Sequence, residues 1–343
     1  MSEESLTTSR NIDAETTIEV TQITREYLFF LPSSLGVYFQ GVVVVIGILG
    51  TAANAFILYG LVASKQHKKH VLIFNQNALD LFSSIFLIIS YAMKLCNIRL
   101  TGSLGHWLCV TLYSDSFTWC GIWGSTINLA SITVERYLKV VHAAWSKTKL
   151  RSWMIYSAAA FAWIIAATYN FALVVTTAMV RDGRCYSHFI WQSETARTIQ
   201  AVLYFMSFYV IILLIIIFGY WRILVVIRRQ ARVMAGHSAA GSSTGQTQSS
   251  HIQISVIKTM ILVSAFFAIS QLPNQIFYLQ MNVDPNFVYV KTTYDATLFI
   301  AFLYISTNPF IYAIKFDPVK QMLLHLIPCK KISDQPNETI HIT

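Results

Sequence analysis

Charged residues are scarce in this chain of 343 residues. Asp, Glu, Lys and Arg make up 12% of it, whereas they make up about a quarter of an average soluble domain. Hydrophobic residues, in contrast, make up 55%. This composition excludes an ordinary soluble domain and indicates a membrane protein. The net charge of +9 is then expected to reflect the orientation of the chain in the membrane and its attraction to anionic lipid. No nucleic-acid partner is predicted.

The sequence also lacks the motifs of enzymes. It has no metal-ligand cluster, no G-x-S-x-G nucleophile elbow and no glycine-rich loop that would hold a phosphate. Residues 1–30 lack the apolar run of a cleavable signal peptide, so the first apolar segment is expected to direct insertion. No internal repeat is evident, which disfavours a transporter built on one. We therefore predict neither an enzyme nor a metal site built from His and Cys.

Seven long apolar runs are what the sequence has in abundance. A helix that crosses the hydrocarbon core of a bilayer needs about 20 mostly apolar residues. The runs cover residues 36–63, 71–95, 107–141, 152–179, 195–227, 254–281 and 288–314. They lack the two-residue alternation of a barrel strand, so helices are the simpler choice. The predicted fold is an all-α membrane protein with a seven-transmembrane helix bundle over residues 36–314.

Lys and Arg are concentrated after the first, third, fifth and seventh runs, whereas the opposite loops have fewer cations and the N-terminal segment is acidic. Loops rich in cations stay in the cytoplasm. The N-terminal segment, residues 1–35, is therefore predicted to be extracellular and disordered, and the C-terminus to be cytoplasmic. The third cytoplasmic loop, residues 235–250, is rich in Gly, Ser and Thr and is expected to be flexible.

Residues 315–329, after the last run, suggest a short amphipathic helix on the inner membrane surface. Asp317 can cap this helix with Pro318 at its first position, and apolar residues recur along one face. Cys329 lies beside two lysines and is a predicted palmitoylation site, with an unmodified cysteine as the alternative. Residues 330–343 are expected to form a cytoplasmic tail.

Six features in six different runs carry a family resemblance. Glu135-Arg136-Tyr137 ends the third run, and Asn308-Pro309-Phe310-Ile311-Tyr312 ends the seventh. The others are Asn54 in the first run, Asp80 in the second, Trp163 in the fourth and Pro273 in the sixth. From about residue 36 to residue 329 the chain resembles the rhodopsin-like (class A) G protein-coupled receptors. The resemblance implies a plasma-membrane receptor for an extracellular ligand, coupled to a heterotrimeric G protein, with receptor kinase and arrestin as further partners.

The adjacent charges Glu135 and Arg136 end a hydrophobic run, where an ion pair is costly. By resemblance, Arg136 pairs with Glu135 at rest and receives the G protein once the sixth helix moves outward. The predicted coupling set is Glu135, Arg136, Tyr137, Tyr220, Asn308, Pro309 and Tyr312. Gln253 replaces the acidic residue that often holds the arginine from the sixth helix, so basal activity is expected. An arginine that merely reaches toward lipid headgroups is the alternative.

Two replacements leave the relay from ligand to G protein open. Gln271 stands where the family usually has a tryptophan, and Ile212 stands where its fifth helix usually has a proline. A constitutively active or non-signalling receptor fold is therefore an alternative function. A seven-helix transporter or channel is a weaker alternative, because Asp80 stands nearly alone in the middle of the membrane and a charge relay would need more members.

Asp80 lies deep in the second run, where a bare charge is costly. The resemblance implies a sodium ion held by Asp80, Ser125 and Asn308. Tyr304 and Ile305, however, stand where the family usually offers small polar groups. A protonated or water-bridged Asp80 is therefore the alternative to a sodium site.

The cysteines offer one pair with a family precedent. The resemblance joins Cys109, at the outer start of the third run, to Cys185 in the loop after the fourth, with Cys96 as the competing partner. The separation in sequence between Cys109 and Arg136 is longer than is usual in the family. We therefore expect a local bulge or a shifted helix start.

By the same resemblance, the ligand binds between the outer halves of the third, fifth, sixth and seventh helices. The predicted lining is Asp115, Thr118, Trp119, Ile122, Phe208, Gln271, Asn274, Gln275, Tyr278, Tyr294 and Phe302. Thr118 replaces the aspartate that binds amines in biogenic-amine receptors, with Asp115 one turn away as a substitute. Phe302 replaces the lysine that binds retinal. The ligands that remain are a peptide, a lipid-derived molecule or another small molecule.

Overall fold

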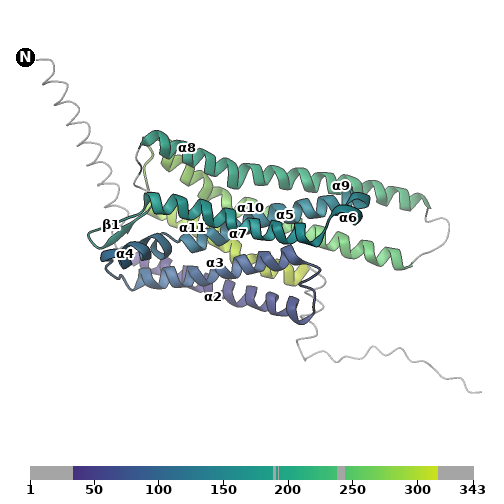
Figure 1. The fold of residues 1–343 in the computed structure, drawn as a ribbon, viewed down its shortest axis with the longest axis horizontal. Coiled ribbons are helices and arrows are strands. Elements are labelled where there is room, and N and C mark those ends of the chain that lie inside the picture. The colour runs from purple at the N-terminus through teal and green to yellow at the C-terminus, as the bar shows by residue number, and fades with distance from the viewer. Residues whose placement is uncertain (1–33, 188–190, 192, 238–243, 316–343) are drawn as a thin grey trace, which may run out of the picture.

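Long apolar segments become helices in lipid, because each backbone N–H and C=O must find its partner without help from water. The computed structural model describes residues 34–187, 191, 193–237 and 244–315, and helices make up most of these residues. The long helices lie side by side along one direction, with connections at the two ends of the bundle (Figure 1).

The described helices follow the predicted runs. The seven long segments are α2 (Ser34–Ala63), α3 (Val71–Leu95), α5 (Ser116–Val141), α7 (Ser152–Thr177), α8 with α9 (Glu194–Phe205 and Ile211–His237), α10 (Thr244–Val283) and α11 (Lys291–Lys315). Six of these segments are long and apolar enough to cross a membrane. The seventh, α5, is more polar, which its position permits because it packs against α3, α7 and α9. The chain is a multi-pass membrane protein with the predicted seven-helix bundle.

The third run is interrupted near its start. Helix α4 (Gly102–Leu108) continues into a π-helix, η1 (Cys109–Tyr113). The chain then turns at Asp115, whose φ of 56° lies in the left-handed region, before α5 begins. The π-helical turn and the break at Asp115 together take up the additional residues before α5 begins. The bulge expected between Cys109 and Arg136 is therefore present.

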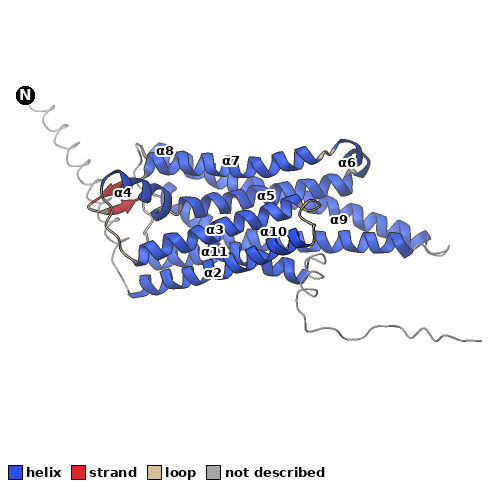
Figure 2. Ribbon diagram, turned by 60° about the horizontal axis from the view of Figure 1, so that its bottom comes forward, coloured by secondary structure: helices blue, strands red, loops and turns tan. Residues whose placement is uncertain are grey.

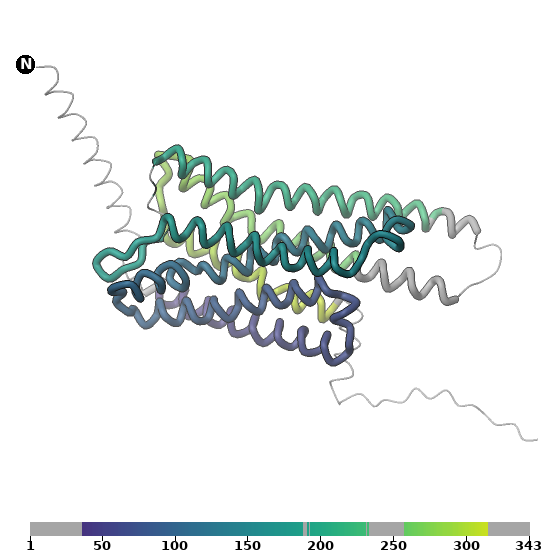
Figure 3. The backbone as a smooth tube through the Cα atoms, viewed as in Figure 1, coloured from purple at the N-terminus to yellow at the C-terminus, as the bar shows by residue number. Residues whose placement is uncertain are grey.

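The fifth run contains a second π-helix, η2 (Met206–Val210), between α8 and α9. Ile212, which replaces the usual proline of the family, follows directly in α9. The irregular turn therefore forms here without a proline. Together α8, η2 and α9 form one long rod along the bundle (Figure 3).

Two prolines lie inside the last two long helices. Pro273 is within α10 and Pro309 is within α11. Each proline lacks the N–H that would bond to the preceding turn, so each weakens its helix locally and favours a bend. Pro273 therefore places a weak point within the continuous helix α10.

Helices α9 and α10 extend further than the sequence predicts. Helix α9 ends at His237 and α10 begins at Thr244, so most of residues 235–250 is helical where we expected a flexible loop. A helix that has already nucleated adds residues at little cost, even when their composition is polar. Apart from Lys315, the predicted amphipathic helix 315–329 with Cys329 lies outside the described residues, as do the tail 330–343 and nearly all of 1–35.

A short antiparallel hairpin of β1 (Met179–Arg181) and β2 (Arg184–Tyr186) lies at the same end of the bundle as α4 (Figure 2). A disulfide joins Cys109 of η1 to Cys185 of β2, as predicted, while Cys96 is not disulfide-bonded. We call this end the disulfide end. The opposite end, which carries the short helix α6 (Ala143–Lys149), is the Arg136 end (Figure 1).

Candidate functional site

A cluster of charges lies at the Arg136 end of α5. Glu135 Oε2 lies 3.7 Å from the guanidinium of Arg136, whereas Glu135 Oε1 lies 2.5 Å from Lys139 Nζ, one turn further along. Arg136 Nε has no hydrogen-bond partner among the described residues. The predicted ion pair is present, but the closer partner of Glu135 is a lysine that we did not predict. The spacing of four residues from Glu135 to Lys139 was the signal for it.

The other members of the predicted coupling set lie on α5, α9 and α11, and one of them, Tyr220, lies near Arg136. Tyr220 of α9 and Tyr312 of α11 are buried in the core. Tyr220 lies close enough to Arg136 and to Tyr312 for electrostatic interaction. Tyr137, next in sequence, has its hydroxyl 3.1 Å from His142 Nε2. Asn308 and Pro309 lie deeper in α11, where Asn308 bonds to Asp80.

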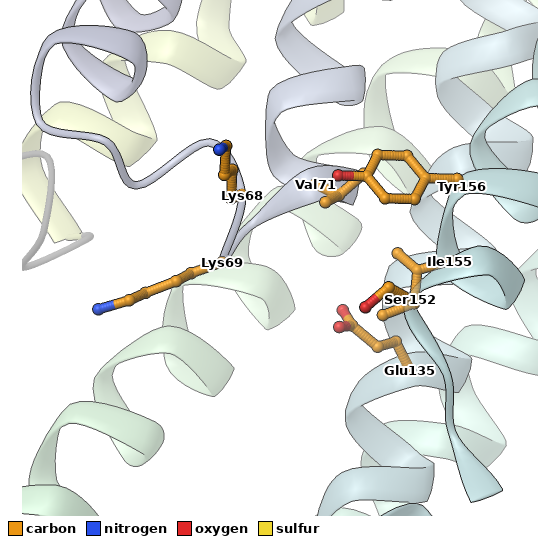
Figure 4. Close-up of a pocket in the computed structure, with 7 residues that line it drawn as sticks. All are labelled: Lys68, Lys69, Val71, Glu135, Ser152, Ile155 and Tyr156. Carbon is orange, nitrogen blue, oxygen red and sulfur yellow. The ribbon is translucent and has the colours of Figure 1, made fainter.

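A small cavity lies beside Glu135 (Figure 4). It is lined by Lys68, Lys69, Val71, Glu135, Ser152, Ile155 and Tyr156. These residues come from the connection before α3, from the start of α3, from α5 and from α7, and Figure 4 shows the two lysines on the opposite side of the cavity from Tyr156. His70 lies between Lys69 and Val71 in the chain. Burial, followed by the nearby Arg136, lowers the pKa of His70 from 6.5 to about 4, so its imidazole is neutral at neutral pH.

At the disulfide end, a lysine from a neighbouring helix holds Asp115. Lys94 Nζ of α3 lies 2.5 Å from Asp115 Oδ2 and 4.2 Å from the centre of the Tyr91 ring. A cation over the face of an aromatic ring is attracted by the ring's electrons. The carboxylate considered above as an anchor for an amine is therefore already paired within the protein.

An aromatic cluster of Trp123, Tyr169, Tyr204 and Phe208 fills the space between α5, α7 and the fifth segment. The ring centroid of Trp123 lies 5.4 Å from that of Tyr169, 5.2 Å from Tyr204 and 5.0 Å from Phe208. The Tyr204 hydroxyl accepts hydrogen bonds from Trp123 Nε1 at 3.2 Å and Gln275 Nε2 at 2.8 Å. We predicted Phe208 and Gln275 but missed Tyr204, although it lies one helical turn before Phe208.

The predicted lining residues are distributed over the inner faces of the same helices. Those that are buried are Asp115, Thr118, Ile122, Phe208, Gln271, Asn274, Gln275 and Phe302, and those that are partly buried are Trp119, Tyr278 and Tyr294. The rings of Trp119 and Phe302 are 5.8 Å apart. The Tyr278 hydroxyl donates to Gln200 Oε1 at 3.0 Å. Rings, amides and hydroxyls are therefore the groups that these helices place together.

Gln271 connects the last two long helices. Its Nε2 donates to the backbone carbonyl of Ala301 in α11 at 3.1 Å. One turn earlier, the Phe267 ring lies 5.8 Å from Tyr304 of α11 and 6.0 Å from Tyr209 of η2. The position where the family usually has a tryptophan thus holds an amide that ties α10 to the backbone of α11.

The three residues proposed for a sodium ion meet in the middle of the bundle. Asp80, Ser125 and Asn308 are fully buried. Asn308 Nδ2 donates to Asp80 Oδ2 at 2.9 Å, and the Ser125 side chain also interacts with the Asp80 carboxyl group. The structure therefore brings the three residues together in the interior of the bundle.

Comparisons with known proteins match this architecture. The model of a family described as "7 transmembrane receptor (rhodopsin family)" matches residues 53–312, from within α2 to within α11. Galanin receptor type 1 of Rattus norvegicus is 22% identical over 314 residues, which cover 87% of this chain and 83% of that receptor. Trace amine-associated receptor 7b of Mus musculus is 23% identical over 244 residues. These cover 68% of this chain but just under two thirds, 65%, of that receptor.

Proposed function

This chain belongs to the rhodopsin family of seven-transmembrane receptors, and we propose that it is a G protein-coupled receptor that transmits an extracellular ligand signal to a heterotrimeric G protein. Beyond family membership, one observation supports this function. Arg136 stands at one end of the bundle, 3.7 Å from Glu135, while Lys139 holds the same carboxylate at 2.5 Å. An arginine held so loosely can exchange its partner.

In this proposal the disulfide end faces outside and the Arg136 end faces the cytoplasm, in a plasma membrane. Disulfides persist in oxidising compartments, which suits the end that carries Cys109 and Cys185. Connections at the Arg136 end contain Lys68, Lys69 and Lys147, in agreement with the positive-inside rule. Receptor kinase, arrestin, membrane lipid and a palmitoyl group on Cys329 complete the proposed partners.

Arg136 is the proposed switch. The contact of Arg136 with Glu135 is long, at 3.7 Å, and Lys139 compensates the same carboxylate at 2.5 Å, so Arg136 can leave without stranding a buried charge. Pro273 supplies a weak point in α10, so the half of α10 on the Arg136 side can swing outward. That motion would open the space in which Arg136, Tyr220 and Tyr312 meet a segment of the G protein.

Gln271 is the proposed link between ligand and switch. Its bond to the Ala301 carbonyl joins α10 to α11 two residues before Pro273. A ligand that forms a hydrogen bond with the Gln271 amide would break its bond to Ala301 and so free α10 from α11 next to Pro273. In this proposal Gln271, at the position where the family usually has a tryptophan, acts through a hydrogen bond. One turn earlier in α10, the ring of Phe267 packs against that of Tyr304 in α11.

The proposed ligand is a peptide or a small molecule recognised by rings, amides and hydroxyls. The names of the relatives refer to galanin and to trace amines, so both kinds of ligand need weighing. An amine needs a carboxylate, and Asp115 is paired with Lys94 at 2.5 Å. Asp295 of α11 is likewise paired, with Lys291 at 2.7 Å. At either of these two acids an amine would have to displace a lysine, which disfavours it there.

The test is G protein activation in cells that express wild type or Arg136→Ala at equal surface level. We expect ligand-independent output from wild type above that of mock-transfected cells, and output equal to mock from Arg136→Ala. Lys147→Ala, which removes an exposed cation of α6 at the same end, is the matched control and should signal like wild type. Equal signalling by wild type and Arg136→Ala would overturn the switch.

A constitutively active receptor is the second candidate function. The observation that favours it is again the closer contact of Glu135 with Lys139, because this weakens the hold on Arg136. High output from wild type that no ligand increases would select this candidate. Silence of wild type in nucleotide exchange with each major class of G protein would reject it.

A further inference from the structure

A chain of side-chain hydrogen bonds crosses the middle of the bundle from α7 to α3 and α5. Trp163 Nε1 donates to Asn75 Oδ1 at 2.9 Å, and Asn75 Nδ2 donates to Asn128 Oδ1 at 2.9 Å. Asn128 Nδ2 then donates to Gln76 Oε1 at 2.7 Å. We call Trp163, Asn75, Asn128 and Gln76 the amide chain.

The direction of the amide chain is determined by groups that have a single role. An indole N–H can only donate, so Asn75 must present its oxygen to Trp163 and its nitrogen to Asn128. Independently, Asn128 Nδ2 donates to the backbone carbonyl of Leu72 at 2.9 Å, and a carbonyl can only accept. Both anchors require the same orientation of Asn128. Gln76 must therefore accept through Oε1 and turn its NH₂ group away from Asn128.

The NH₂ group of Gln76 points at the residues around Asp80. It donates to the Ser125 hydroxyl and to the Tyr304 hydroxyl, the latter at 3.2 Å. Ser125 Oγ lies in turn 3.3 Å from the Tyr304 hydroxyl. Gln76 and Ser125 both interact with the Asp80 carboxyl group. The donor end of the amide chain, the NH₂ group of Gln76, is therefore directed toward the Asp80 carboxyl group. All of these side chains are fully buried, so water does not weaken their electrostatic interactions.

These residues fit a sodium ion poorly. Two oxygens favour a cation, because Asp80 Oδ1 and Asn308 Oδ1 have no hydrogen-bond partner in the part of the chain that the structure describes. However, oxygen-binding cations such as calcium and magnesium take about six or more oxygen ligands. The Ser125 and Tyr304 oxygens accept from Gln76, and Ile305 offers no polar side-chain atom. The N–H groups of Gln76 would also repel a cation placed between these hydroxyls.

We propose that the amide chain, ending in Gln76 and the Tyr304 hydroxyl, takes the place of a cation beside Asp80, so that this receptor does not bind sodium there. A fixed array of donors cannot leave when the receptor changes state, whereas a bound ion can. The state of the bundle is then independent of sodium concentration. This inference concerns the bundle itself and does not depend on the proposed coupling to a G protein.

The test is thermal unfolding of the purified full chain in NaCl and in choline chloride at equal ionic strength. We expect the same Tm for wild type in both salts. The double variant Gln76→Leu with Tyr304→Asn removes the donors and supplies a small polar group. Its Tm should rise by roughly 2–4 °C in saturating NaCl, because a ligand that binds the folded state stabilises it. Adding Asp80→Asn to the double variant should abolish the rise.

A saturable rise in the Tm of wild type with NaCl, absent in Asp80→Asn, would overturn the proposal. If the double variant folds but its Tm does not rise with NaCl, Gln76 and Tyr304 are not the residues that keep sodium from binding beside Asp80. If the double variant does not fold, sodium NMR line broadening by wild type, compared with Asp80→Asn, decides the question. Broadening that requires Asp80 contradicts the proposal, and equal spectra for the two proteins support it.

Discussion

Asp115 and Glu135 stand at opposite ends of α5, and each is 8% exposed. Their partners differ. Lys94, which lies 2.5 Å from Asp115, belongs to α3 and so joins two helices. Glu135 is shared by Lys139 at 2.5 Å and Arg136 at 3.7 Å, both of α5 itself. Asp115 and Glu135 are equally buried, but Asp115 joins two helices through Lys94, whereas Glu135 holds Arg136 only loosely.

The contrast shows how the cost of a buried charge can serve rigidity or motion. When a buried carboxylate has a single partner, separating the pair leaves an uncompensated charge, which is strongly destabilising. When two cations share a carboxylate, one can leave while the other still compensates it. We therefore expect the disulfide end to resist opening and the Arg136 end to permit it.

The largest effect is expected from Lys94→Met. This change leaves the Asp115 carboxylate buried without its cation, and breaking such a pair costs about 3–5 kcal/mol. The free energy of unfolding should therefore fall by about 3 kcal/mol, measured as a decrease in Tm of the purified receptor. The double variant of Lys94→Met with Asp115→Asn should recover most of the loss, because no charge is then left behind.

Lys291→Met is the matched control for this change. Lys291 pairs with Asp295 at 2.7 Å, but its side chain is more exposed than that of Lys94, 31% against 19%, and both partners lie on α11. Its loss should therefore cost less than about 1 kcal/mol. If Lys94→Met and Lys291→Met cost the same, the claimed role of Lys94 as a bridge between helices is wrong.

The next largest effect is expected from acid at the Arg136 end. Burial, followed by Arg136, lowers the pKa of His70 from 6.5 to about 4, with Lys139 and Lys69 acting in the same direction and Glu135 opposing them. Below pH 6.5 the unfolded chain binds a proton that the folded chain does not. The stability contributed by neutral His70 is thus complete above pH 6.5 and is lost as the pH falls toward 4.

This prediction is checked by chemical unfolding of wild type and His70→Gln across that range. Wild type should lose up to about 2 kcal/mol between pH 7 and pH 5 through this group. His70→Gln should lose less over the same interval, by about that amount. Parallel pH profiles for the two proteins would show that His70 does not sense the charges around Arg136.

The smallest effect is expected from Lys139→Met. Removing this lysine gives Glu135 a single cation, Arg136, and so makes the Arg136 end more like the disulfide end. A partly exposed ion pair of this kind contributes about 0.2–1 kcal/mol, so basal nucleotide exchange on the G protein should fall by a factor of up to about five. Lys139→Arg keeps the charge and should leave exchange near the wild-type rate. An increase in basal exchange with Lys139→Met would contradict the sharing of Glu135.

Much of the fold could be predicted because the bilayer imposes a simple rule on the chain. Runs of apolar residues long enough to cross it must be helical, and the starts of α3 and α7 at Val71 and Ser152 agree with the runs. The pair of Cys109 and Cys185 followed from the family resemblance and is confirmed. The loop at 235–250 was less predictable, because helix ends depend on weak local propensities.

Within the sites, residue types were easier to predict than their partners. Glu135, Asp115 and Asp80 stand out because a buried acid is unusual in an apolar chain. Of their actual neighbours, Lys139 and Gln76 lie one turn from Glu135 and Asp80 on the same helix, whereas Lys94 reaches Asp115 from another helix. A single sequence gives no distance between residues on different helices.

The sequence by itself determined the number of long apolar segments, the family and the acids that need compensation, since these depend on composition and on spacing along the chain. Only the tertiary structure decided how each acid is compensated. Lys94 reaches Asp115 from α3, and the direction of the amide chain follows from Trp163 on α7 and the Leu72 carbonyl on α3. Hydrogen bonds and ion pairs act over about 3 Å, so they depend on how the helices pack and not on their order.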